Sequence, residues 1–208
     1  MEDRFRFNLS PQEALNLITT FYCAEVRNRH KEVKIDEATG NNLVALAEII
    51  TSKAPKFGLM FCGPVGNGKT TLMKAFQRCI NYLDCIHHFE FLDDKEYGRR
   101  YKAEMRIVDV RELIRTAKDD QPAFDTFKRF QILGIDDLGK EQAEIMDYGN
   151  ILTPVIDLLE YRYDKQLFTV ITTNLVGKEI REKYGERIAD RFNEMLDLIV
   201  FRNSTYRQ

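Results

Sequence analysis

The segment that most constrains the fold is residues 63–70, which read GPVGNGKT and match the pattern G-x-x-x-x-G-K-[ST]. An apolar run at residues 57–62 precedes it, and apolar residues follow helical spacing from Lys69 to Leu83. Glycines allow the backbone to form a concave set of N–H donors, and the start of a helix adds the positive end of its dipole. The segment therefore predicts a strand, a phosphate-binding loop and a helix.

Within this loop the expected ligands are the phosphates of ATP and a Mg²⁺ ion. The ammonium group of Lys69 would reach the β- and γ-phosphates, and the hydroxyl of Thr70 would bind Mg²⁺. A glycine-rich turn with a chance lysine is the alternative, which the coincidence of strand, motif and helix disfavours. The predicted nucleotide-binding residues are Gly63, Pro64, Val65, Gly66, Asn67, Gly68, Lys69, Thr70 and Thr71.

A second candidate site is the apolar run at residues 132–135, which ends in Asp136 and Asp137. Ligands of open α/β sheets bind beside the carboxyl ends of the strands, where this pair would lie. Asp136 would hold Mg²⁺, directly or through water, and Asp137 would orient or deprotonate the attacking water. The alternative is a strand that runs into an acidic turn.

Two further segments carry weaker signals. Residues 167–174 form an apolar strand pattern that ends at Asn174, whose amide could hold the attacking water, although such strand ends are common in turns. Arg187 and Arg191 are four residues apart, on one face of a predicted helix. An arginine fork suits the charge of a transferring phosphoryl group, whereas an arginine–aspartate surface network is the alternative.

The rest of the chain shows short apolar runs that alternate with helical patterns, as buried parallel strands joined by crossover helices do. Strands are expected at residues 57–62, 106–110, 131–135, 167–172 and 198–201, and helices at 69–83 and 151–163. These elements predict a three-layer α/β domain over residues 55–208. Residues 1–54 are expected to form a helical appendage, with one helix capped by Ser10 and a second at 42–52.

Charge and composition limit the partners and the location. Lys and Arg number 31 against 33 Asp and Glu, so the whole chain lacks the charge excess of a nucleic-acid-binding protein. The local basic excess between Lys95 and Lys118 could contact DNA, with Tyr97 and Tyr101 as stacking faces, or could be a solvated charged helix. No apolar stretch approaches the ~20 residues of a membrane span, and the start has no apolar signal core, so we expect a cytoplasmic protein.

Residues 55–207 resemble the DnaC/IstB branch of the AAA+ ATPases, which includes replicative helicase loaders and transposition ATPases. The resemblance rests on GPVGNGKTT, ILGIDDLG, VITTNL, YGERIADRF and NSTYR. It implies a P-loop NTPase with a parallel five-stranded sheet in the order 5-1-4-3-2. It also implies an AAA+ core without a C-terminal helical lid, because the sequence ends soon after the fifth predicted strand.

The resemblance also implies residue roles. Asp136 and Asp137 match the Walker B acids, Asn174 the sensor asparagine, and Arg191 the arginine finger that reaches a neighbouring subunit's nucleotide. Arg187 is a helper or replacement for Arg191. Many AAA+ proteins have Glu where Asp137 stands, so hydrolysis is expected to be slow or dependent on assembly of an ATP-bound homo-oligomer.

Four functions fit these motifs. An ATPase that loads a replicative helicase during DNA replication is the leading interpretation, and an ATPase that helps a transposase of a mobile element is nearly as favoured. DNA, single-stranded or duplex, is a candidate partner for both. A small-molecule P-loop kinase is the rival from another class, because GPVGNGK also fits G-x-x-G-x-G-K. A nucleotide-binding switch with negligible catalysis is the fourth.

Overall fold

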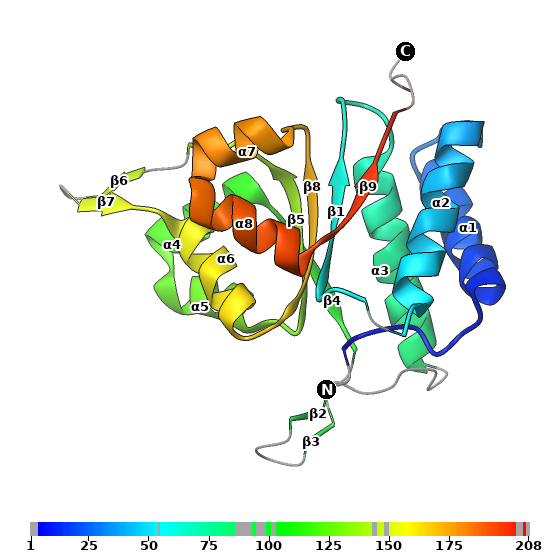
Figure 1. The fold of residues 1–208 in the computed structure, drawn as a ribbon, viewed down its shortest axis with the longest axis horizontal. Coiled ribbons are helices and arrows are strands. Elements are labelled where there is room, and N and C mark those ends of the chain that lie inside the picture. The colour runs from blue at the N-terminus through cyan, green and yellow to red at the C-terminus, as the bar shows by residue number, and fades with distance from the viewer. Residues whose placement is uncertain are drawn as a thin grey trace.

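A five-stranded parallel sheet forms the centre of the molecule in the computed structural model (Figure 1). The structure describes residues 4–53, 55–85, 93–94, 99–100, 103–142, 145–147, 150–202 and 206. The sheet order is β4-β5-β8-β1-β9. Numbered along the chain, these five strands lie in the order 5-1-4-3-2, which confirms the predicted parallel sheet and its strand order. Their bounds are β1 Gly58–Cys62, β4 Met105–Asp109, β5 Ile132–Leu138, β8 Phe168–Thr173 and β9 Asp197–Val200.

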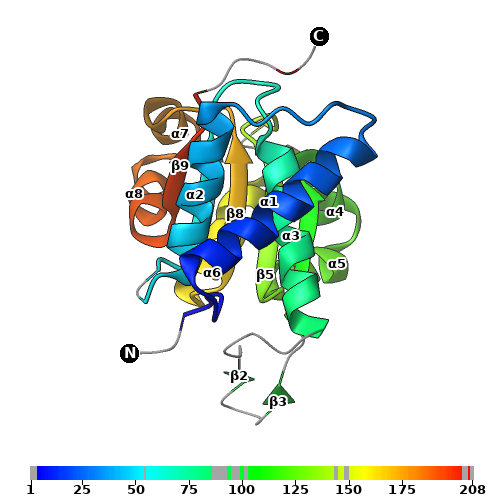
Figure 2. The same ribbon diagram turned by 90° about the vertical axis from the view of Figure 1, so that its right-hand side faces the viewer.

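Helices cover both faces of this sheet and give the predicted three layers (Figures 1 and 2). One face is covered by α1 (Pro11–Asn28), α2 (Glu37–Thr51) and α3 (Lys69–Cys85). The other is covered by α4 (Val110–Asp119), α5 (Gln121–Arg129), α6 (Pro154–Asp164), α7 (Gly177–Tyr184) and α8 (Glu186–Met195).

Each face of the sheet has its own hydrophobic cluster. Side chains alternate along a strand, so Leu59 and Phe61 of β1 join the cluster under α1, α2 and α3, whereas Met60 joins the cluster on the other face. Both faces of β1 are thus buried, as a central parallel strand requires. This rigid centre holds the loops at the carboxyl ends of the strands.

The two N-terminal helices pack on the same core. Ser10 caps α1 in a capping box with Glu13, as predicted. The ring of Phe7 stacks on that of Phe76 with centroids 5.5 Å apart, and the backbone N–H of Phe7 donates to the carbonyl of Ile50. The division between residues 1–54 and 55–208 stays a prediction, while α1 and α2 share the hydrophobic cluster of α3 and the sheet.

Several element bounds differ from the predicted ones. Helix α2 begins at Glu37 rather than at residue 42, because Asp36 caps it by accepting a 2.8 Å hydrogen bond from the Thr39 N–H. Helix α6 begins at Pro154 rather than at residue 151, because residues 150–152 pair as β7 (Asn150–Leu152) with β6 (Ile145–Asp147).

Strand pairing also extends beyond the predicted elements. Strand β5 continues to Leu138, past the predicted end at residue 135. A second antiparallel pair joins β2 (Asp93–Asp94) and β3 (Arg99–Arg100). Within the described ranges, every helix is too short or too polar to cross a lipid bilayer.

Candidate nucleotide-binding site

The loop between β1 and α3 has the backbone shape that its glycines permit. Gly63, Gly66 and Gly68 have φ angles of 150°, 85° and 97°, in the region that side chains with a Cβ rarely adopt. A Cβ at Gly63 would lie 2.4 Å from the carbonyl oxygen of Phe201, so only glycine fits this approach to the chain after β9. The loop leads directly into α3 at Lys69, as a phosphate-binding loop does.

Lys69 is buried in this loop, with 5% of its surface exposed. Its Nζ donates hydrogen bonds to the carbonyls of Gly63 (2.6 Å) and Pro64 (2.7 Å) and to Oδ1 of Asn67 (3.1 Å). Burial lowers the pKa of Lys69, and the nearby carboxylate of Asp137 acts in the opposite direction. A phosphate oxygen in the loop would offer the ammonium group a charged acceptor in place of these neutral ones.

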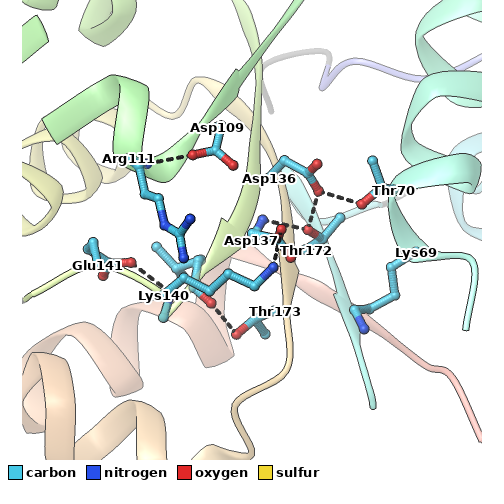
Figure 3. Close-up of polar contacts among 12 residues, drawn as sticks. Lys69, Thr70, Asp109, Arg111, Asp136, Asp137, Lys140, Glu141, Thr172 and Thr173 are labelled. Carbon is cyan, nitrogen blue, oxygen red and sulfur yellow. Dashed lines mark hydrogen bonds and ion pairs between the residues drawn. The ribbon is translucent and has the colours of Figure 1, made fainter. Parts of the chain in front are cut away.

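Asp136 lies at the end of β5 beside the first turn of α3 (Figure 3). Its Oδ1 accepts hydrogen bonds from the hydroxyls of Thr70 (2.9 Å) and Thr172 (2.5 Å). Carboxylate and hydroxyl oxygens are ligands that Mg²⁺ accepts, usually together with phosphate oxygens. The pairing of Thr70 with Asp136 therefore fits a Mg²⁺ site.

A bulge in β5 sets the direction of the second aspartate. Ile135 pairs with Ile171 and Leu138 with Thr173, so β5 contains one more residue than β8 over this stretch. Asp137 has a φ of 62°, and its backbone N–H donates to the Thr172 hydroxyl at 2.8 Å. The bulge turns the Asp137 side chain toward the cavity described below.

The turn after β5 is fixed to α7 by buried polar contacts. The Glu141 carboxylate accepts from the hydroxyl of Tyr184 and, at 2.9 Å, from the backbone N–H of Gly139. The Lys183 ammonium donates to the Gly139 carbonyl at 2.7 Å and lies 3.8 Å from the Glu141 carboxylate. Burial and this carboxylate raise the pKa of Tyr184, which keeps the phenol protonated as the donor.

Lys69, Thr70 and Asp137 line a cavity of about 610 Å³ at the carboxyl edge of the sheet. Loop residues, Asp137 and Asn174 line it on the sheet side. The end of α1, the α1–α2 connection and the C-terminal region form another wall. The complete lining is Tyr22, Val26, Arg29, Lys31, Glu32, Lys34, Val65, Gly66, Asn67, Gly68, Lys69, Thr70, Thr71, Asp137, Lys140, Asn174 and Tyr206.

Tyr206 connects the glycine-containing loop at residues 63–68 to α2. Its backbone N–H donates to the Gly66 carbonyl at 2.9 Å, its hydroxyl donates to the Asp36 carboxylate at 2.7 Å, and the Thr39 hydroxyl lies 2.7 Å from it. Burial, with Tyr206 and Asp36 nearby, raises the pKa of Tyr22 to about 12. The cavity wall opposite the sheet therefore contains the phenols of Tyr22 and Tyr206 and the connection after α1.

The two arginines lie apart from this cavity, on the side of α8 that packs against α6. Arg191 is 13% exposed; its guanidinium lies 3.1 Å from the Glu160 carboxylate and 4.7 Å from the centre of the Tyr163 ring. Arg187 is 72% exposed and lies 3.2 Å from the same carboxylate. Neither is among the residues that line the cavity. The structure thus gathers the predicted loop, aspartate and asparagine residues, but not the arginines.

The structure describes only part of the stretch from Lys95 to Lys118 that was predicted to contact DNA. Lys95, Tyr97, Tyr101 and Lys102 lie outside the described residues. Among the basic residues of the stretch that lie in the described ranges, Arg99 and Arg100 are on β3, Arg106 is on β4, and Arg111, Arg115 and Lys118 are on α4. DNA binding through this region stays a prediction.

Lys140, Thr172 and Tyr22 are among the contributors to the site that sequence reasoning missed. Thr172 belongs to the same predicted strand that led to Asn174. Its contact with Asp136 could have been predicted only from the parallel pairing of this strand with β5. The sequence gives no signal for Lys140 or Tyr22. The position of Lys140 depends on the turn after the bulge in β5, and that of Tyr22 depends on how α1 packs.

Comparisons with known proteins agree with this architecture. No protein-family model matches the sequence, and no curated protein matches it significantly. The structure is similar to a crystal structure of the DnaC helicase loader. The TM-score is 0.57 and the sequence identity is 22%, over 83% of this chain and 94% of that one. For "Crystal Structure of the DnaI" the TM-score is 0.58 and the identity 22%, over 85% and 88%.

A third similar structure is a putative primosome component from Streptococcus pyogenes serotype M3, with a TM-score of 0.57 and 17% identity over 84% of this chain and 86% of that one. AMPPCP-bound DnaA from Aquifex aeolicus has a TM-score of 0.50 and 17% identity, over 80% of this chain and 48% of that one. At these identities the similarity shows the fold alone, and that fold agrees with the one expected from the motifs.

Proposed function

We propose that this chain binds Mg-ATP in the 610 Å³ cavity and hydrolyses it, as a cytoplasmic ATPase that loads a replicative helicase during DNA replication. The observation that carries the proposal is the arrangement around the cavity. A buried lysine in a glycine loop, a threonine–aspartate pair and a second aspartate converge at the carboxyl edge of one sheet. Phosphate, Mg²⁺ and water are the groups that these side chains suit.

Hydrolysis would proceed as follows with the residues in these positions. The loop N–H groups and Lys69 would bind the phosphates, and Thr70 and Asp136 would hold a Mg²⁺ ion, which would supply positive charge to neutralise the phosphates. Asn174 and Asp137 orient a water molecule. The water oxygen bonds to the γ-phosphorus, the bond to the bridging oxygen breaks, and ADP leaves with that electron pair. Asp137 takes the water proton.

The helicase-loading role rests on similarity of fold and on the location of the arginines. Two of the similar structures are described as a helicase loader and a putative primosome component. Arg187 and Arg191 lie away from the cavity of their own chain, so any contact with nucleotide requires a second copy. A homo-oligomer with nucleotide at its subunit boundaries fits that location, and a replicative helicase, with DNA, is the proposed partner.

Lys69→Ala tests the nucleotide site. Mg-ATP at 100 times its dissociation constant stabilises a protein that binds only in the folded state by ~2.7 kcal/mol. We expect thermal melting to show this stabilisation for the wild-type protein and to show none for Lys69→Ala. Lys74→Ala is the matched control, because Lys74 is an exposed lysine on the same helix.

Two results would contradict the proposal. Equal stabilisation of Lys69→Ala and wild type by Mg-ATP would show that nucleotide binds elsewhere. Transfer of the γ-phosphate to nucleosides rather than to water would replace the ATPase by a small-molecule kinase. Both measurements use the full chain.

A further inference from the structure

Lys140 lies in the turn after β5, outside every motif that the sequence presents. Its ammonium group pairs with the carboxylate of Asp137, and its backbone N–H donates to the Asp137 carbonyl at 3.2 Å (Figure 3). The Lys140 side chain is 34% exposed and lines the cavity together with Lys69 and Asn174. A second lysine therefore stands at the end of the cavity where Asp137 would act on water.

The carboxylate of Asp137 interacts electrostatically with the ammonium groups of both Lys69 and Lys140. Burial is the main cause of the lowered pKa of Lys69; Asp137 opposes this shift and Lys140 adds to it. The two ammonium groups and Asp137 are thus close enough to affect one another. A γ-phosphate between them would bring negative charge to both lysines and would repel Asp137.

The backbone of this turn is fixed, whereas the Lys140 side chain is free to change partners. Glu141 accepts a hydrogen bond from the Gly139 N–H, and Lys183 donates to the Gly139 carbonyl. Lysine has a flexible four-carbon stem and a compact charge that can move between neighbouring acceptors. Its ion pair with Asp137 is partly exposed, so little free energy opposes the exchange.

We propose that Lys140 is a catalytic residue that contacts the γ-phosphate of ATP. Without nucleotide it pairs with Asp137; with ATP bound it moves to a γ-phosphate oxygen and leaves Asp137 to accept the water proton. This inference rests on the proposed ATPase function and adds a residue to it. It gives a single chain a preference for ATP over ADP, because ADP has no γ-phosphate for Lys140 to contact.

The ratio of the ADP and ATP dissociation constants tests this contact without reference to turnover. Titrations with Mg-ATP and Mg-ADP should show that Lys140→Met lowers the preference for ATP on the order of tenfold, the effect of one charge-assisted hydrogen bond. Lys140→Arg should retain most of the preference. Lys178→Met is the matched control, because Lys178 is 84% exposed on α7 and pairs with Glu182.

Asp137→Asn provides an independent test because it releases Lys140 without removing it. We expect this variant to bind Mg-ATP more tightly than the wild type, and we expect the gain to disappear in Asp137→Asn/Lys140→Met. The double variant separates the Lys140 contact from the simple loss of a negative charge beside the γ-phosphate.

The inference is wrong if Lys140→Met binds ATP and ADP with the wild-type ratio, or if the gain in Asp137→Asn persists without Lys140. Equal weakening of both nucleotides would show that Lys140 only positions the turn, and would also overturn the inference. Lys140→Gln replaces the methionine variant if that variant does not fold. Wild-type protein that binds neither nucleotide would refute the proposed function itself.

Discussion

At the scale of single residues, the most unusual side chain is Arg162, which is completely buried. Its guanidinium donates to the carbonyls of Phe130 and Phe168, both at 2.7 Å, and to the hydroxyl of Thr169 at 2.8 Å. Burial lowers the pKa of Arg162 to about 9, which leaves it charged at neutral pH. These bonds fix the amino ends of β5 and β8, whose carboxyl ends carry Asp136 and Thr172.

Arg162→Met should lower the free energy of unfolding by roughly 3 kcal/mol, because several buried oxygens lose their donor at once. Urea denaturation would measure the loss. Arg129→Met is the control, since Arg129 is exposed at the end of α5, and we expect a change within ~0.5 kcal/mol. If both variants were equally stable, Arg162 would not hold the strand ends.

The difference between Lys69 and Arg162 shows what a sequence can predict about single residues. The place of Lys69 in a loop that leads into a helix was predictable, because it depends on neighbours within residues 63–70. Arg162 was not, because three of its acceptors belong to Phe130, Phe168 and Thr169, which lie on other elements. Lys140 belongs to the same class, since a bulge in β5 decides where its side chain lies.

At the scale of elements, short apolar runs predicted all five strands of the central sheet, and helical spacing predicted α1, α2, α3 and α6 but not α5 or α7. The errors lie at the ends of elements, where one capping or pairing contact decides the boundary, as Asp36 does for α2. The short pairs β2–β3 and β6–β7 were missed because two or three residues carry too little periodicity. The order of the sheet came from the resemblance rather than from any local pattern.

Substitution by alanine should change the stability of the protein in opposite directions at two glycines, one in a loop and one in a helix. Gly63→Ala places a Cβ 2.4 Å from the Phe201 carbonyl at a φ of 150°, so the loop and the chain after β9 must shift. Gly40→Ala, within α2, meets nothing within 4 Å and should stabilise the protein by ~0.5–1 kcal/mol.

Thermal melting with and without Mg-ATP measures both effects of these glycine variants. Gly63→Ala should lower the melting temperature and remove the stabilisation by nucleotide. Gly40→Ala should raise the melting temperature and keep that stabilisation. A Gly63→Ala protein that binds Mg-ATP normally would show that the loop tolerates a side chain at this position.

At the scale of the whole molecule, α1 and its connection to α2 form one wall of the cavity at the carboxyl edge of the sheet. Tyr22 on α1 lines the cavity, and Tyr206 bonds both Gly66 and the Asp36 cap of α2. Residues 1–54 were expected to form an appendage because they contain no motif that indicates a part in the site. Their role in its wall follows from tertiary packing, which the order of elements alone does not give.

The opposite side of the sheet carries Arg187 and Arg191, and their distance from the cavity leads to a test of assembly. If subunits associate head to tail, the arginines of one chain face the nucleotide of the next, so each active site needs two chains. Arg191→Ala should then bind Mg-ATP but lose ~10³-fold or more in the turnover of the assembled protein, as removal of an arginine finger does.

Lys69→Ala keeps the arginines but should not bind the nucleotide. A mixture of these two inactive variants should recover turnover, because the intact loop of one can meet the intact arginine of the other. Arg181→Ala, at an exposed arginine that pairs with Glu186, should stay active alone and serves as the control. A mixture no more active than its components would show that these arginines do not act across a subunit boundary.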